Sequence, residues 1–306
     1  MAGPIIECVP NFSEGRDHAK VDAIAGAMGG TPGVAVLDCH LDPDHNRSVV
    51  TLAGAPEAVV EGAFRGIAKA AEVIDLRAHS GVHPRVGAAD VVPLVPVERA
   101  TLDECAVLAE TLGRRVWSEL AIPVYFYEAC ARRPDRQRLE SVRKSRLETL
   151  AAETPDLRPD IGGPAFHPTA GAAIIGARGF LVAYNIDLRT GDVEAARAIA
   201  RAVRASSGGL PAVKAMGLYL ASRRCAQVSM NLTDFRRTPP ETAFHAVRAE
   251  AARLGVELAQ GELIGLVPRA ALDAGREWFE HLGRSASEPV LERRLLAAGL
   301  VHSSTQ

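Results

Sequence analysis

Strand-like and helix-like segments alternate along this chain, and the same order occurs twice, which limits the possible folds more than any other feature. In the first half, apolar periodicity predicts strand 5–10, helix 17–28, strands 34–39 and 48–52, and helix 56–74. The second half gives strand 180–188, helix 191–206, strands 213–220 and 226–231, helix 240–254, and strand 262–267. This repetition predicts an α/β (α+β) fold of two ferredoxin-like β-α-β-β-α-β subdomains, each a sheet with helices on one face, with a substrate cleft or tunnel between them.

The first half continues beyond this pattern. Thr101 and Glu104 form a capping box that opens a predicted helix at 101–120, and strand 123–127 follows. The segment between helices 56–74 and 101–120 is expected to be irregular. We place an N-terminal subdomain at 1–178, a C-terminal subdomain at 179–283 and a tail at 284–306.

Composition excludes several classes of protein. Apolar residues make up 47% and charged residues 24%, which argues against disorder, and a net charge of −2 provides no general attraction for nucleic acid. The most apolar stretch, 172–186, is interrupted by Arg178 and is too short to span a membrane, and no signal peptide is apparent. Five cysteines without a C-x-x-C spacing indicate reduced thiols in a cytoplasm.

Histidines and an arginine gather in the segment 77–87, where Gly81 and Pro84 oppose a helix. His79, His83 and Arg85 lie within a few residues of one another there. A histidine can act as a general acid or base near neutral pH, or serve only as a hydrogen-bonded structural residue. A metal site with His79 and His83 as ligands is disfavoured, because Gly81 and Pro84 oppose the helix that would align the two rings.

A second cluster of polar residues occupies 37–47, between two predicted strands. Its acids and histidines could orient an imidazole. Asp42, Asp44 and Asn46 are equally explained by ordinary Asx-type turns. Arg47 could hold a carboxylate or join a surface ion pair.

A glycine- and proline-rich segment at 160–171 precedes an apolar strand. Its glycines permit close approach of a ligand to the backbone, and Phe166 offers a face for a flat heterocycle, although such a segment is also common as a plain connector. No phosphate-binding glycine motif is present. Seven basic and two acidic side chains between 132 and 146 form either a solvated helix face or a docking strip for a polyanionic tail.

These motifs resemble those of the formiminotransferase family, in the form that lacks a cyclodeaminase domain. The resemblance rests on the opening segment 7–15, on His83-Pro84-Arg85 with Gly87-Ala88, and on segments 160–185, 226–231 and 261–268. It covers about residues 1 to 275.

The resemblance implies transfer of the formimino group from N-formimino-L-glutamate to tetrahydrofolate, giving 5-formiminotetrahydrofolate and L-glutamate. It also implies small-molecule substrates, a substrate tunnel between the two subdomains, and a homodimer. Composition and cysteine usage add the expectation of a cytoplasmic protein with no nucleic-acid or membrane partner, and no metal is expected. His83 is the implied catalytic acid/base. The implied folate-binding segment is Gly162, Gly163, Pro164, Ala165, Phe166, His167, Pro168, Thr169, Ala170 and Gly171, and the substrate-binding candidates are Asn11, Arg47, Arg85, Asn185 and Asn231.

One position departs from the family pattern. Where family members carry an Asp two residues after Asp38, this chain has His40, so Asp38, His40, Asp42 and Asp90 are all candidates to support His83. A changed acid also admits a changed donor. The alternatives are therefore a folate-dependent N-formylglutamate formyltransferase or, less favoured, a metal-dependent hydrolase using His79 and His83.

Overall fold

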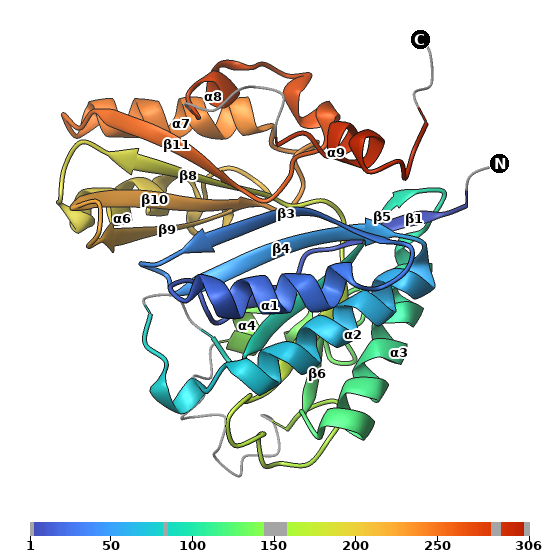
Figure 1. Cartoon of the computed structure of the whole chain (residues 1–306). Coiled ribbons are helices and arrows are strands. Elements are labelled where there is room, and N and C mark those ends of the chain that lie inside the picture. Colours follow the sequence, from blue (N-terminus) through green and yellow to red (C-terminus); the bar gives the residue numbers. More distant parts are fainter. Residues whose placement is uncertain (1–2, 82–84, 144–157, 283–288, 303–306) are drawn as a thin grey trace. The chain divides into compact units, whose positions relative to one another are not determined.

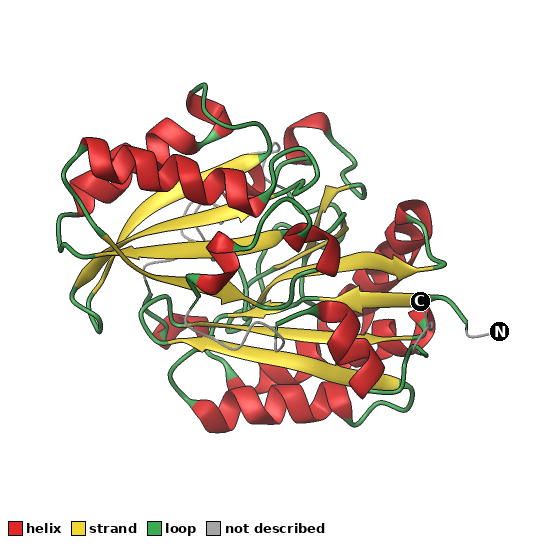
Figure 2. Ribbon diagram, turned by 90° about the horizontal axis from the view of Figure 1, so that it is seen from above, coloured by secondary structure: helices red, strands yellow, loops and turns green. Residues whose placement is uncertain are grey.

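The computed structural model describes residues 3–81, 85–143, 158–282 and 289–302. The chain divides into two compact units, Met1–Arg178 (unit 1) and Gly179–Gln306 (unit 2). Each unit has its own β-sheet with helices packed against it (Figures 1 and 2). The prediction of a two-part fold of mixed α/β content is therefore confirmed.

Unit 1 contains a ferredoxin-like sheet with an extension. Its elements are β1 (Ile5–Cys8), β2 (Asn11–Phe12), α1 (His18–Gly29), β3 (Val34–Asp42), β4 (Arg47–Gly54), α2 (Pro56–Val73), η1 (Leu76–Ala78), β5 (Ala89–Glu98), α3 (Leu102–Leu120), β6 (Val124–Glu128), η2 (Pro134–Arg136), α4 (Leu139–Arg143) and β7 (Ala173–Ala177). Because β1 and β2 pair with the same two neighbours, they form one interrupted strand, and the antiparallel order is β5, β1/β2, β4, β3. Strands β7 and β6 continue the sheet beyond β5 in parallel.

Strand β5 corrects the expectation of an irregular segment before α3. Pro93 and Pro96 argue against a central strand because proline cannot donate to a sheet ladder. Both lie where pairing with the interrupted strand breaks: Pro93 accepts a hydrogen bond from Val9, in the gap between β1 and β2, and Pro96 lies at a register shift opposite β1. The interruption of β1/β2 therefore accommodates Pro93, and the register shift within β1 accommodates Pro96.

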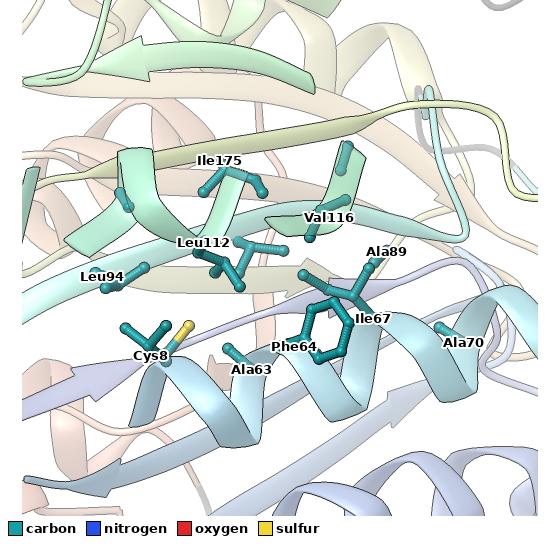
Figure 3. Close-up of a cluster of buried hydrophobic side chains, with 14 of the residues drawn as sticks. Cys8, Ala63, Phe64, Ile67, Ala70, Ala89, Leu94, Leu112, Val116 and Ile175 are labelled. Carbon is teal, nitrogen blue, oxygen red and sulfur yellow. The ribbon is translucent and has the colours of Figure 1, made fainter. Parts of the chain in front are cut away.

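Helices α1, α2 and α3 supply apolar side chains to one continuous core with the sheet of unit 1. Figure 3 shows Ala63, Phe64 and Ile67 of α2 facing Leu112 and Val116 of α3 in this core. The capping box predicted for α3 is present, because Thr101 accepts from Glu104 N–H and the Glu104 carboxylate accepts from Thr101 N–H. A second, smaller core forms around Tyr125 and Tyr127 of β6.

Unit 2 repeats the ferredoxin-like order, and its described residues form four strands. Its elements are β8 (Val182–Leu188), α6 (Val193–Val203), η4 (Ala205–Ser207), β9 (Val213–Leu220), β10 (Cys225–Leu232), α7 (Pro240–Arg253), β11 (Leu258–Ile264), η5 (Arg269–Leu272), α8 (Glu277–Glu280) and α9 (Leu291–Ala297). The antiparallel order is β11, β8, β10, β9. Trp278 is fully buried and packs edge-on against Tyr184, with ring centroids 5.2 Å apart.

Candidate active site

Three segments that the sequence singled out meet in unit 1. Asn46, in the turn after β3, donates from Nδ2 to the Ser80 carbonyl at 3.0 Å, which joins the 37–47 and 77–87 segments. A Cβ at Gly81 would collide with the His45 carbonyl oxygen, so the backbones approach closely there. The third segment, 160–171, is attached to the 77–87 segment by two backbone hydrogen bonds. Ala172 N–H donates to Val86 O at 3.0 Å, and Ala88 N–H donates to Ala170 O at 2.9 Å.

The opening motif is attached to the same place. Asn46 has a left-handed backbone, with φ of 47°, and its Oδ1 accepts from Gly15 N–H at 3.0 Å. The Ser13 hydroxyl donates to Gly87 O at 2.7 Å, and Ser13 N–H donates to Ala88 O at 2.9 Å. The motif is therefore anchored to both of the neighbouring segments.

A small pocket lies where these segments meet. It is lined by Ser13, His45, Asn46, Arg47, His79, Arg85 and Asp90. The structure thus brings together Arg47, Arg85 and Asp90, which the sequence analysis singled out separately, and Asn11 reaches the pocket through Arg47.

Positive charge exceeds negative charge around this pocket. Arg47 donates from Nε and Nη2 to Asn11 Oδ1, at 3.0 and 2.7 Å. The Asp90 carboxylate is 2% exposed, accepts from Val86 N–H at 2.7 Å, and lies 2.5 Å from Arg143 Nη2 and 4.0 Å from Arg47 Nη2. Burial and the Arg143 guanidinium together lower the pKa of Arg47 to about 9. A bound carboxylate would offset this crowding of cations.

His79 is held with one ring nitrogen hydrogen-bonded and the other without a partner. Its Nε2 lies 3.0 Å from the Asn46 carbonyl oxygen, whereas its Nδ1 is buried and makes no hydrogen bond with the residues that the structure describes. Burial, with a smaller contribution from the Arg85 charge, lowers the pKa of His79. Arg85 in turn donates from Nη2 to the His79 carbonyl at 2.8 Å. The side chain is therefore a neutral imidazole at neutral pH.

The predicted catalytic residue, His83, lies outside the described residues, as does Pro84. Among its candidate supporting groups, only Asp90 lines the pocket in the described part of the chain. Asp38 and His40 lie on β3, opposite Thr51 and Val49 of β4, and Asp42 accepts from His45 N–H at 2.8 Å.

The predicted folate-binding segment follows a path fixed by contacts within unit 1. Gly171 has a positive φ and its Cα faces Val86 O, and a Cβ at Gly162 would press on the Trp117 ring, so both glycines are explained by packing. The surroundings of Gly163 are open. Phe166 packs on Tyr125 with ring centroids 6.5 Å apart, and His167 Nδ1 accepts from Ala170 N–H at 3.0 Å.

The two remaining substrate-binding candidates lie in unit 2. Asn185 is buried on β8, with Ser229 and Glu262 as its cross-strand neighbours, and Asn231 is exposed on β10. A polar network that the sequence did not indicate lies on the same sheet: Arg223 bridges Asp187 and Glu262 at 2.9 and 2.8 Å, and Gln227 donates to Asp187 at 2.8 Å.

The basic segment is largely neutralised by acids of the same unit. The ion pairs are Arg132–Glu110, Arg133–Asp135, Arg136–Asp160 and Arg143–Asp90. These cations stabilise the fold, so they give no support to a docking strip. Lys144 and Arg146 lie outside the described residues.

Among the described residues, one group of side chains has the composition of a metal site, and it belongs to unit 2 and does not include His79. Glu241, His245 and Glu277 bring one potential ligand atom each within 4.8 Å of the others. Glu241 already accepts from Trp278 N–H, and Glu277 pairs with Arg248. Contacts within the chain therefore account for both carboxylates.

Sequence reasoning missed the roles of Ser13, Asn46 and Arg143. Asn46 was assigned only to a turn, and Arg143 only to a basic strip. Each acts through a residue at least 31 positions away in the chain, and no local pattern reveals such a contact.

Comparison with known proteins gives matches over both units. The formiminotransferase domain, N-terminal subdomain, matches residues 5–178, and the formiminotransferase domain matches residues 183–293. In the described part of the chain, no helix is long and apolar enough to cross a membrane.

Curated relatives agree with the domain matches. The glutamate formimidoyltransferase of Thermoplasma acidophilum is 44% identical over 95% of this chain and 97% of its own length. That of Streptococcus pyogenes serotype M1 is 40% identical, over 95% and 99%. The formimidoyltransferase-cyclodeaminase of Rattus norvegicus is 42% identical over 88% of this chain and 51% of its own length. The chain belongs to the formiminotransferase family.

Proposed function

We propose that this protein transfers the formimino group from N-formimino-L-glutamate to tetrahydrofolate and releases L-glutamate. The observation that carries the proposal is the 40 to 44% identity, over nearly the whole chain, to two proteins named glutamate formimidoyltransferase. The chemistry of the unit 1 pocket agrees with this assignment, because an excess of arginine suits a donor that carries carboxylates.

Arg47 and Arg85 are the proposed carboxylate-binding residues. Both line the pocket, and the carboxylate of Asp90, which lines it with them, is already engaged by Arg143 and Val86 N–H. Asn11 holds the Arg47 guanidinium from one side. The cationic side chains are thus positioned before a ligand arrives, which lowers the entropic cost of binding.

His83 is the proposed general acid and base. The transfer requires one proton to leave the attacking amine of the acceptor and one to reach the departing amine of glutamate, and a single imidazole can perform both steps. The described residues on either side of His83 support this role, because Gly81 abuts His45 and Arg85 lines the pocket. Asp90 is the proposed acid that supports His83, since each carboxylate oxygen can accept a second hydrogen bond beside those from Val86 N–H and Arg143.

The folate-binding segment is proposed to be 162–171, where Gly163 leaves open space and Phe166 provides an aromatic ring. The protein is further proposed to act as a homodimer in the cytoplasm. Five free cysteines agree with a reducing compartment.

The test measures glutamate release from N-formimino-L-glutamate and, separately, N-formyl-L-glutamate, each with tetrahydrofolate and with or without a chelator. Release from the formimino donor that persists with chelator supports the proposal. Release from the formyl donor alone would reassign the protein as a formyltransferase, and release abolished by chelator would favour a metal-dependent reaction. Absence of release from both donors would reject the activity.

A further inference from the structure

Nδ1 of His79 is an acceptor that no residue in the described part of unit 1 uses. A carbonyl oxygen can only accept, so the 3.0 Å contact with Asn46 O requires the hydrogen of a neutral His79 ring to be on Nε2. Nδ1 then has a lone pair, and this buried atom makes no hydrogen bond. A buried acceptor without a partner is unfavourable, so a ligand that donates to it gains affinity.

Among the other acceptors that line this pocket, Asn46 Oδ1 accepts from Gly15 N–H, and the Ser13 hydroxyl is oriented toward Gly87 O. Both oxygens of Asp90 are engaged, by Val86 N–H and by Arg143. His45 also lines the pocket, and its Nε2 is buried as well. For His79, however, the contact with Asn46 O fixes which ring nitrogen is the acceptor, so its Nδ1 is a defined partner for a donor group on a ligand.

We propose that His79 is the residue that selects a formimino over a formyl donor, by accepting a hydrogen bond at Nδ1 from the terminal N–H of the formimino group. This inference rests on the proposed function. The two donors share the glutamate portion and differ at one atom: the formimino group ends in an N–H donor, whereas the formyl group ends in an oxygen that can only accept.

Lone-pair repulsion at Nδ1 also weakens binding of the formyl donor, so the formimino donor is favoured and the formyl donor is disfavoured at the same atom. A formyl oxygen placed beside Nδ1 would bring two acceptors together without a hydrogen, while the formimino nitrogen forms a hydrogen bond at the same position. The lowered pKa of His79 keeps the ring neutral, and so keeps Nδ1 an acceptor, at neutral pH.

Two substitutions separate the two nitrogens of the ring. In His79→Gln the side-chain amide reaches the position of Nε2 and can still donate to Asn46 O, but the acceptor at Nδ1 is lost. In His79→Asn the amide oxygen lies near the position of Nδ1 and retains an acceptor. The two variants are therefore matched controls for each other.

The experiment measures dissociation constants of N-formimino-L-glutamate and N-formyl-L-glutamate by calorimetry for the wild type and both variants. We expect His79→Gln to reduce the preference for the formimino ligand about 10- to 100-fold, and His79→Asn to retain most of it. An unchanged ratio in His79→Gln, or equal affinity of the wild type for both ligands, would overturn the proposal.

A second measurement needs no variant. In protein labelled with ¹⁵N-histidine, the Nδ1 resonance of His79 is expected to move upfield with the formimino ligand and to stay in place with the formyl ligand. An unmoved resonance would also overturn the role of His79. Glutamate release by the wild type is assayed in parallel, so loss of the proposed activity is distinguished from loss of selectivity alone.

Discussion

The two units use the same strand order, but only unit 1 gathers its polar segments into the pocket described above. In unit 1 the antiparallel order β5, β1/β2, β4, β3 corresponds strand for strand to β11, β8, β10, β9 in unit 2. Unit 1 differs by an interrupted first strand and by the added strands β6 and β7. The segments that lead into β4 and β5 line the pocket together with Ser13, and the segment that leads into β7 is hydrogen-bonded to Val86 and Ala88. The shared strand order therefore does not determine where the site lies. The segments that connect the strands determine it.

The largest expected effect is on turnover, from a substitution in a unit 1 segment. His83→Ala should lower turnover about 10²- to 10⁴-fold, because proton transfer loses its positioned group. His18→Ala, at an exposed position on α1, is the control. Single-turnover assays of glutamate release check this, and near-wild-type turnover of His83→Ala would remove the catalytic role of that segment.

A large effect on stability is expected from the aromatic core of unit 2. Trp278 is fully buried against Tyr184, and Trp278→Ala should reduce the free energy of unfolding by about 3 to 5 kcal/mol. Trp278→Phe should cost less because it leaves a smaller cavity. Urea titrations followed by circular dichroism measure both, and equal losses for the two variants would mean that cavity size does not govern the cost.

Substrate affinity should respond to the arginines of unit 1. Arg47→Ala is expected to raise the Michaelis constant for the formimino donor about 10- to 100-fold, through loss of a charge-assisted hydrogen bond. Arg253→Ala, exposed on α7 in unit 2, should leave it unchanged. A Michaelis constant that is the same in both variants would show that Arg47 does not hold the donor.

The smallest effect concerns pH and is shared by both units. Burial lowers the pKa of His79 in unit 1 and of His281 in unit 2. The folded protein binds these protons less readily than the unfolded chain. The free energy of unfolding is therefore at its full value above about pH 6.5 and decreases as the pH drops below that value. Urea titrations at pH 7.5 and 5.5 should show a smaller loss in His79→Gln and in His281→Gln than in the wild type. A loss as large as that of the wild type in both variants would contradict this origin.

Much of the fold followed from local patterns in the sequence. Helices α2, α3 and α7 begin and end within a residue of their predicted bounds, because proline or capping residues mark where they start. Strand β5 was missed because Pro93 and Pro96 are tolerated through an interruption and a register shift in a partner strand that is distant in the sequence. The identity of that partner strand cannot be inferred from the residues around β5 alone.

The candidate site was predicted in part. Arg47, Arg85 and Asp90 were recognised by residue type and by family resemblance, and the structure places them around one pocket. The pairing of Arg143 with Asp90 joins residues 53 positions apart, and in the sequence Arg143 is one of several similar cations. The fixed orientation of the His79 ring likewise depends on a carbonyl 33 residues away.

The two side-chain bonds of Asn46 also restrict how the lengths of these segments can change during evolution. Asn46 Oδ1 accepts from Gly15 N–H, and Asn46 Nδ2 donates to Ser80 O. An insertion or deletion in any of these three segments would therefore break at least one of the two hydrogen bonds. At Gly208 in unit 2, by contrast, an added Cβ would meet open space, and the Gly208 N–H bonds to Ala205 O, only three residues away in the chain. Length variation among relatives should therefore accumulate at turns such as Gly208, while the three joined segments keep a common length.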